Sequence, residues 1–142
     1  MTAELRYWKE LLAADVALFA RSLPLMAFGP RYWAADPDNE AVVRELTTVI
    51  APGTLRQIDV DLAVDLTSVL DSIAAPTLVL ASSYDRIIEP DQQQALLDGI
   101  ANARYAEIDA GHGAPAEDPA GFITRIAGFL DASAQPALPA RP

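Results

Sequence analysis

Residues 76–90 decide the fold class, and they read PTLVLASSYDRIIEP. After Pro76, the run 77–81 is short, continuously apolar and rich in residues that favour strands. This pattern is typical of a strand that is buried on both faces of a parallel sheet. A loop through Asp85 then leads to Pro90, a residue well suited to the first turn of a helix. The stretch therefore predicts a strand, a loop and the start of a helix.

The chain downstream repeats this order of a strand followed by a helix. Residues 104–108 form a second, weaker strand pattern, which is followed by a loop containing Gly111-His112-Gly113. Pro119 then opens a final helix. The apolar residues of this helix have the spacing of a core-facing stripe: Phe122, Ile126, Phe129 and Leu130. Two strands joined through a helix make a parallel crossover, so we predict an α/β fold with a βαβα unit.

The first half of the chain carries helical patterns instead. Apolar residues recur every three or four positions in four segments, which begin near Leu5, Val16, Val42 and Leu55. The fourth segment runs on toward Ile73. Pro24 lies inside the second segment, so we expect a kink or a break there, and Gly29-Pro30 should end it.

The composition narrows the class of protein. The 142 residues include no cysteine and one histidine, and their formal charge is −10. The lack of cysteine excludes a disulfide scaffold, a thiolate zinc site and a cysteine nucleophile, and we expect no metal and no other cofactor. The acidic balance argues against nucleic acid or a membrane surface as partner. No run approaches the roughly 18 apolar residues of a membrane helix, and charged residues interrupt any signal-peptide core, so we predict a cytoplasmic protein.

Asp85 and His112 are candidates for a catalytic acid–base pair. Each lies just past the end of a predicted strand, where parallel α/β sheets place their functional residues. Neighbouring strands would bring both residues to one edge of the sheet. The aspartate could then accept a hydrogen bond from one imidazole nitrogen, which leaves the other nitrogen to take a proton from a nucleophile or a water. A lone loop histidine is more often structural, and an aspartate after a strand is often a turn cap, so spacing alone leaves both interpretations open.

Three aromatic residues are candidates for lining an apolar substrate pocket: Trp8, Tyr32 and Trp33. At helical spacing such residues are also explained as plain core. The acidic residues Asp59, Asp61 and Asp65 lack the glycine and the terminal glutamate of a calcium loop. We therefore expect these three carboxylates to form a solvated helix face.

The second half of the chain resembles the C-terminal end of proteins with the α/β-hydrolase fold. Residues 73–80, IAAPTLVL, resemble the I-x-x-P-T-L-V that leads into the strand before the acid of the catalytic triad. Residues 85–90, DRIIEP, resemble the segment from that aspartate to the following proline. Residues 103–112 resemble the last strand with the G-H of the triad histidine, and residues 117–130 resemble the E-x-P-x-x-F…F-L of the final helix.

The resemblance implies a partial α/β-hydrolase fold. Residues 1–64 would be a helical lid or cap, and residues 65–131 would be the C-terminal portion of the hydrolase core. The Ala/Pro-rich composition of residues 132–142 predicts a disordered tail. Within this fold, Asp85 matches the triad acid and His112 the triad base.

The family's nucleophile has no counterpart in this sequence. No G-x-S-x-G or related elbow occurs, and Ser82 and Ser83 lie in the loop of the acid, where we expect structural polar residues. We therefore expect a truncated hydrolase that supplies the acid–base pair for ester, lactone or thioester cleavage or for acyl transfer. Its nucleophile would come from a missing segment or from a complementary N-terminal hydrolase half, and its substrate would be small, apolar and ester-like. The alternatives are a non-catalytic module that binds a small ligand or self-associates, and a fragment without activity of its own.

Overall fold

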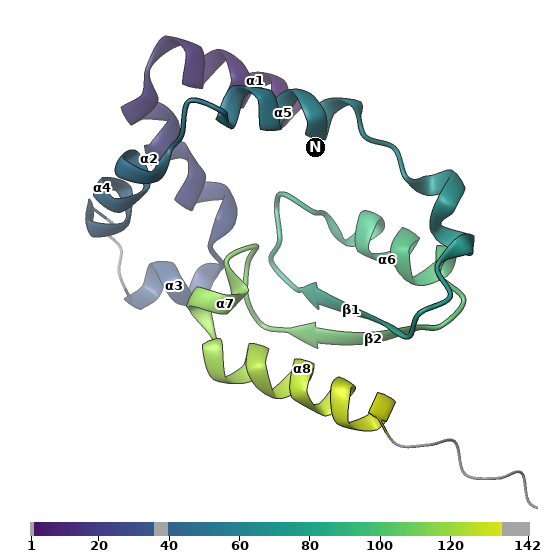
Figure 1. Ribbon diagram of the computed structural model, residues 1–142. Helices are drawn as coiled ribbons and strands as arrows, with labels where there is room; N and C mark the ends of the chain where they lie inside the picture. The colour runs from purple at the N-terminus through teal and green to yellow at the C-terminus, as the bar shows by residue number, and fades with distance from the viewer. Residues whose placement is uncertain (1, 36–39, 135–142) are drawn as a thin grey trace, which may run out of the picture.

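The computed structural model describes residues 2–35 and 40–134, and Figure 1 shows how their helices and strands are arranged. The N-terminal half consists of helices: α1 (Thr2–Ala14), α2 (Val16–Ala27), α3 (Pro30–Ala35), α4 (Glu40–Val49) and α5 (Thr54–Ala63). A 3₁₀ turn (Thr67–Ser72) leads to the second half: β1 (Thr77–Ser82), α6 (Pro90–Gly99), β2 (Ala103–Ile108), α7 (Ala114–Glu117) and α8 (Pro119–Ala134). The predicted fold class is therefore confirmed. None of the helices in the described part of the chain is long and apolar enough to cross a membrane.

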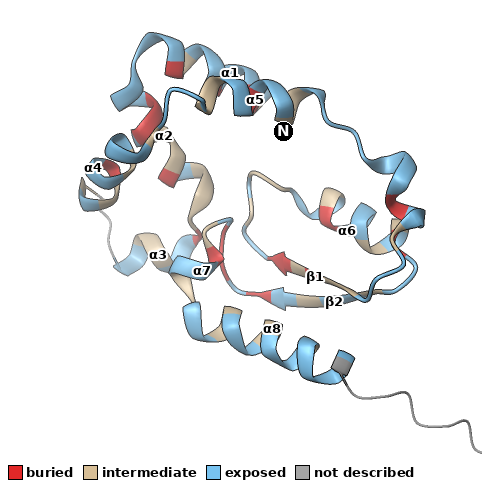
Figure 2. Ribbon diagram, in the orientation of Figure 1, coloured by how far each residue is buried: buried red, intermediate tan, exposed pale blue. Residues whose placement is uncertain are grey.

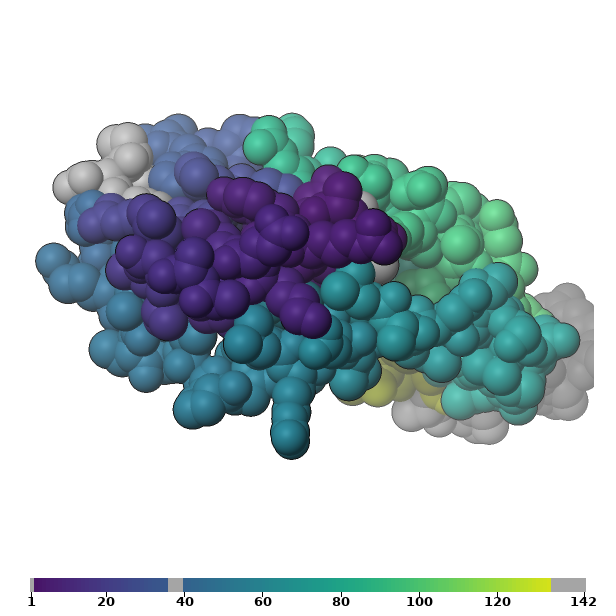
Figure 3. Space-filling model, turned by 90° about the horizontal axis from the view of Figure 1, so that it is seen from above, coloured from purple at the N-terminus to yellow at the C-terminus, as the bar shows by residue number. Residues whose placement is uncertain are grey.

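The N-terminal helices pack around their own cluster of buried apolar side chains. The cluster consists of Leu5, Trp8, Leu12, Phe19 and Ile58. The ring of Trp8 meets that of Phe19 edge to face, with 6.1 Å between the ring centroids. This cluster joins α1 to α2 and α5, and α1 and α5 lie side by side in Figure 3.

Helix α2 differs from the expectation of a break at Pro24. The helix begins after Asp15, whose carboxylate accepts hydrogen bonds from the amides of Ala17 and Leu18, and it continues past Pro24 to Ala27. The side chain of Pro24 is fully buried, so packing offsets the hydrogen bond that proline cannot donate. The helix ends before Gly29-Pro30, as predicted. A short helix that the sequence analysis did not predict, α3, then starts at Pro30.

The fourth predicted helix is shorter than its apolar pattern suggests. Helix α5 ends at Ala63, and the 3₁₀ turn takes the place of an extension toward Ile73. The carboxylate of Asp65 accepts a hydrogen bond from the amide of Thr67 at 2.9 Å. Such local side-chain bonds compete with helical hydrogen bonds, which explains the interruption.

The two strands form the predicted parallel pair, and their register sets Thr77 opposite Ala103 and Ser82 opposite Ile108. Helices α6 and α8 lie on opposite faces of this pair in Figure 1. The expected burial of the first strand on both faces is only partly met, because Val79 is buried while Leu78 and Leu80 are half-buried. A two-stranded sheet is too narrow to be covered fully on both faces.

Helix α8 is more exposed than a core-facing stripe would be (Figure 2). Phe122 is half-buried, whereas Leu130 is 57% exposed. Phe129 faces the sheet, because the guanidinium of Arg104 in β2 lies 6.0 Å from the centre of its ring. Leu130 is the next residue, about 100° further around the helix, so it points away from that contact.

The helix also extends into the predicted tail of residues 132–142, because α8 ends at Ala134. Residues 132–134 contain no proline or glycine, and alanine has the highest helix propensity. The rest of the predicted tail, residues 135–142, lies outside the described residues.

Candidate functional site

Asp85 and His112 both lie in the loops that follow the two strands, at one edge of the sheet. Beyond the last pair of the sheet, the amides of Ser83 and Tyr84 donate to the carbonyl groups of Ile108 and Ala110, each at 3.0 Å. The loop that follows each strand therefore leaves the sheet alongside the other loop. This carries the two candidate residues to the carboxyl edge of the sheet, where parallel sheets usually hold their functional groups.

The side chains of Asp85 and His112 are in contact. Nδ1 of His112 lies 3.1 Å from Oδ2 of Asp85. The other oxygen, Oδ1, accepts hydrogen bonds from the amides of Ile87 and Ile88, each at 2.8 Å. Because a carboxylate can only accept, Nδ1 carries the proton, and in the neutral ring Nε2 is left as an acceptor. The aspartate thus orients the imidazole in the form that a general base needs.

Burial and hydrogen bonding set the charge states of this pair. The side chain of Asp85 is 8% exposed and that of His112 is 45% exposed. Burial opposes ionisation of Asp85, but hydrogen bonds from His112 and from two amides outweigh it and hold the pKa of the carboxyl below its usual value. The hydrogen bond to Asp85 raises the pKa of His112 above its usual value, against the effect of burial. Both shifts favour a carboxylate beside an imidazole that takes up protons readily.

The loop that carries His112 is attached to the turn between α2 and α3. Glu117 accepts hydrogen bonds from the amide of Gly111 at 2.8 Å and from that of Gly29 at 3.0 Å. The amide of Gly113 donates to the carbonyl of Ala27 at 2.8 Å. Sequence reasoning matched Glu117 to the E-x-P pattern but assigned it no role. Nothing local indicates that role, since one of its partners is 88 residues away in the sequence.

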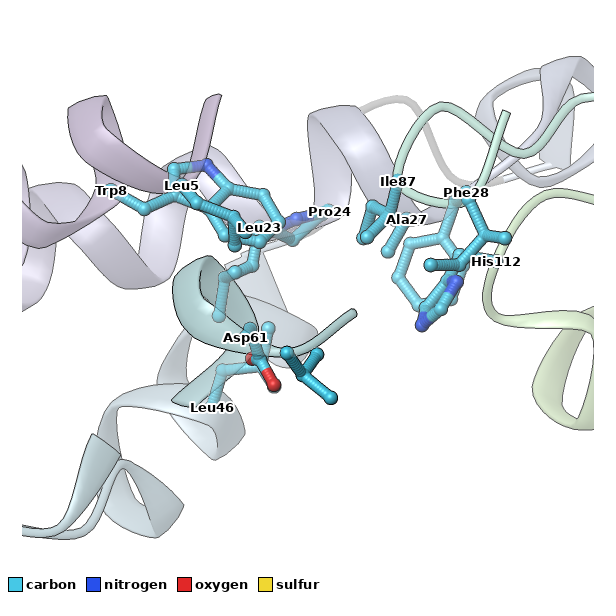
Figure 4. Close-up of a pocket in the computed structure, with 12 residues that line it drawn as sticks. Leu5, Trp8, Leu23, Pro24, Ala27, Phe28, Leu46, Asp61, Ile87 and His112 are labelled. Carbon is cyan, nitrogen blue, oxygen red and sulfur yellow. The ribbon is translucent and has the colours of Figure 1, made fainter. Parts of the chain in front are cut away.

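A pocket of about 520 Å³ lies between the N-terminal helices and His112 (Figure 4). Trp8, one of the three predicted aromatic residues, lines it. Trp33 lines a separate hollow next to Asp85, and Tyr32 stacks on Phe28 with 4.0 Å between the ring centroids. The structure therefore does not gather the three aromatic residues in one pocket.

The pocket also contains a carboxylate that the sequence did not reveal. Asp61 lines it together with His112, which corrects the expectation that the side chains of Asp59, Asp61 and Asp65 form a solvated helix face. Asp61 lies three residues after the buried Ile58, so it shares the inward face of α5. This spacing is the signal that could have identified it.

Of the two serines near Asp85, one is buried and the other is hydrogen-bonded to a side chain of the neighbouring strand. Ser82 is the last residue of β1 and is buried, and the hydroxyl of Ser83 donates to Glu107 at 2.6 Å. Within residues 2–35 and 40–134, no group of three or more histidine, aspartate or glutamate side chains is placed to hold a metal ion.

Comparison with known proteins links this fold to hydrolases. The sequence is 29% identical over 126 residues to pyrrolizixenacetamide deacetylase of Xenorhabdus hominickii. The matched region covers 87% of this chain and 47% of that protein. It is 35% identical over 126 residues to a protein of Azorhizobium caulinodans named as a carbamate hydrolase, RutD. This matched region covers 84% of this chain and 46% of that protein. No model of a protein family matches the sequence.

The structure is similar to solved structures of the same kind. It matches MGS-M2, an α/β hydrolase enzyme from a Medee basin deep-sea metagenome library, with a TM-score of 0.77 and 21% sequence identity. The match covers 99% of this chain and 53% of that chain. The chain also spans about half the length of the curated relatives that it matches.

Proposed function

The chain belongs to the α/β-hydrolase fold superfamily, of which it carries the C-terminal part, and from that premise we propose that it supplies the acid–base pair of a hydrolase. The reaction is hydrolysis of an ester, lactone or thioester, or transfer of the acyl group of such a compound to another acceptor. The observation that carries this proposal is the contact of 3.1 Å between Nδ1 of His112 and Oδ2 of Asp85.

The roles follow from the geometry of the pair. Nε2 of His112 takes the proton from the hydroxyl of a nucleophile as its oxygen attacks the acyl carbon. Asp85 stabilises the imidazolium that forms. His112 then gives the proton to the leaving oxygen or sulfur as the acyl bond breaks. In the second half of the reaction, it takes a proton from the water that releases the acyl group and returns it to the nucleophile.

The nucleophile would come from a segment outside these 142 residues, either on the same polypeptide or on a partner. This part of the proposal is supported by the lack of a G-x-S-x-G elbow in the sequence. The sheet supports it too. Among the described residues, β1 pairs with β2 along one edge only, and its other edge is left for a strand of that segment. The pocket beside His112 suits a small apolar acyl or alcohol group.

A chimera tests the proposal. The part of the Azorhizobium relative that this chain does not cover is joined to residues 1–142, and hydrolysis of p-nitrophenyl acetate is measured. We expect the chimera to hydrolyse the ester and His112→Ala to lower kcat at least about 100-fold. The matched control is Asp98→Asn on α6, which should leave kcat unchanged because Asp98 is exposed and lines neither of the two pockets beside His112.

The isolated chain provides a second measurement that does not depend on the chimera. A fluorophosphonate probe, which labels activated serines, should leave the isolated chain unlabelled. Labelling that His112→Ala abolishes would contradict the external nucleophile. An active chimera whose kcat survives His112→Ala would contradict the role of His112.

Self-association is the second candidate function, and it is favoured by the edge of β1 that pairs with no strand in the described part of the chain. A two-stranded sheet is marginally stable by itself, and strand edges seek partners. Two copies joined through β1 would form a four-stranded sheet. Light scattering during size-exclusion chromatography should then show the mass of a dimer, whereas a monomer at every concentration would contradict this candidate.

A further inference from the structure

The pocket beside His112 holds a single carboxylate among apolar side chains. Among the described residues that line it, ten of twelve are apolar, and the other two are Asp61 and His112. Figure 4 shows Asp61 beside Leu46 and separated from the imidazole of His112 by the pocket. A ligand that reaches His112 with one end can therefore reach Asp61 with the other.

Asp61 has capacity for a further hydrogen bond. Its Oδ1 accepts from Nε2 of Gln57, one helical turn earlier on α5, at 2.9 Å. The hydrogen bonds among the described residues leave Oδ2 to water or to a ligand. The residue is half-buried, so a ligand that fills the pocket removes water from this oxygen.

This displacement of water restricts the chemistry of the ligand. A wholly apolar ligand would remove water from Oδ2 of this carboxylate without giving it a new partner, which is unfavourable. An anionic ligand would add repulsion, since no lysine or arginine is among the described lining residues. A ligand with an N–H donor, above all a protonated amine, would form a charge-assisted hydrogen bond instead.

We propose that Asp61 makes the pocket selective for molecules with an apolar body and a cationic amine at the end away from the bond that is cleaved. The inference rests on the proposed function, because it takes the pocket as the place where the substrate of His112 binds. It adds the class of that substrate: an ester-like molecule that carries an amine.

Binding of three unreactive probes to the purified chain tests the inference. Phenylbutylamine, phenylbutanol and phenylbutanoate share one apolar body and differ in the charge of the end group. By isothermal titration calorimetry, we expect the amine to bind at least about tenfold more tightly than the carboxylate, with the alcohol between them. His112 is the only histidine of the chain, so a shift of its Hε1 signal in the NMR spectrum on amine binding places the ligand in this pocket.

Asp61→Asn should weaken binding of the amine at least about tenfold and leave binding of the alcohol unchanged. The matched control is Asp98→Asn, because Asp98 accepts from Gln94 at 2.8 Å in the same i, i+4 arrangement on α6 but does not line this pocket. Circular dichroism of both variants checks that the helices are retained.

The inference would be overturned by equal affinities for the amine and the carboxylate, by unchanged amine binding in Asp61→Asn, or by no amine binding at millimolar concentration. Binding of the amine without a shift at His112 would also overturn it. The probes contain no bond to cleave, so these outcomes are independent of whether His112 acts as a base.

Discussion

Gly29 and Gly111 approach each other so closely that a Cβ on Gly111 would lie 2.7 Å from the amide nitrogen of Gly29. Their amides share the carboxylate of Glu117 as acceptor. This contact joins the turn before α3 to the loop that holds His112. The position of the candidate base therefore depends on a part of the chain that lies more than eighty residues earlier.

Replacing Gly111 by alanine should destabilise the protein by about 1–3 kcal/mol. The added Cβ would lie 2.5 Å from the carbonyl oxygen of Ala27, and backbone atoms on both sides would have to move. The measurement is urea unfolding. The matched control is Gly128→Ala in α8, where the Cβ meets open space and alanine should stabilise the helix by about 0.5–1 kcal/mol. Equal effects of the two substitutions would contradict the close contact.

Glu117→Gln should loosen the same junction. A glutamine offers one oxygen, so it can accept from the amide of Gly29 or from that of Gly111, but its NH₂ group faces the other amide. We expect faster hydrogen exchange of one of the two glycine amides and a loss of stability of about 1–3 kcal/mol. Glu45→Gln, at an exposed position of α4, is the control. Unchanged exchange at both glycines would show that the carboxylate does not hold them.

The pKa of His112 can be measured without ambiguity, because the chain contains a single histidine. NMR titration of the native chain should give a value above 6.5, since the hydrogen bond to Asp85 favours the imidazolium. Asp85→Asn removes the negative charge, so the pKa should fall. Asp109→Asn is the control, because Asp109 pairs with Arg31 instead. A pKa that stays the same in Asp85→Asn would contradict the contact.

The same pair should make stability depend on pH. The pKa of His112 is raised on folding, so its contribution is complete below pH 6.5 and is lost as the pH rises through the folded-state value. The pKa of Asp85 is lowered, so its contribution is present above pH 3.8 and is lost as the pH falls through the folded-state value. The stability difference between the native chain and Asp85→Asn should therefore be largest between pH 3.8 and 6.5. Urea unfolding at a series of pH values measures this, and a difference that is constant with pH would contradict it.

The sequence by itself determined the features that depend on local signals. The apolar run after Pro76 predicted β1, Pro90 and Pro119 marked the first residues of α6 and α8, and the polar residues after the two strands were placed in loops. These features follow from backbone preferences and short-range periodicity, which neighbouring residues carry.

Only the tertiary structure decided which distant residues meet. It placed Asp61 in the pocket and Glu117 at the junction of two loops, and it separated Trp33 from Trp8. It also left Leu130 exposed, whereas the neighbouring Phe129 contacts Arg104 of β2. Such contacts depend on the relative placement of whole elements, which arises from packing across the chain and has no counterpart in the spacing of neighbouring residues.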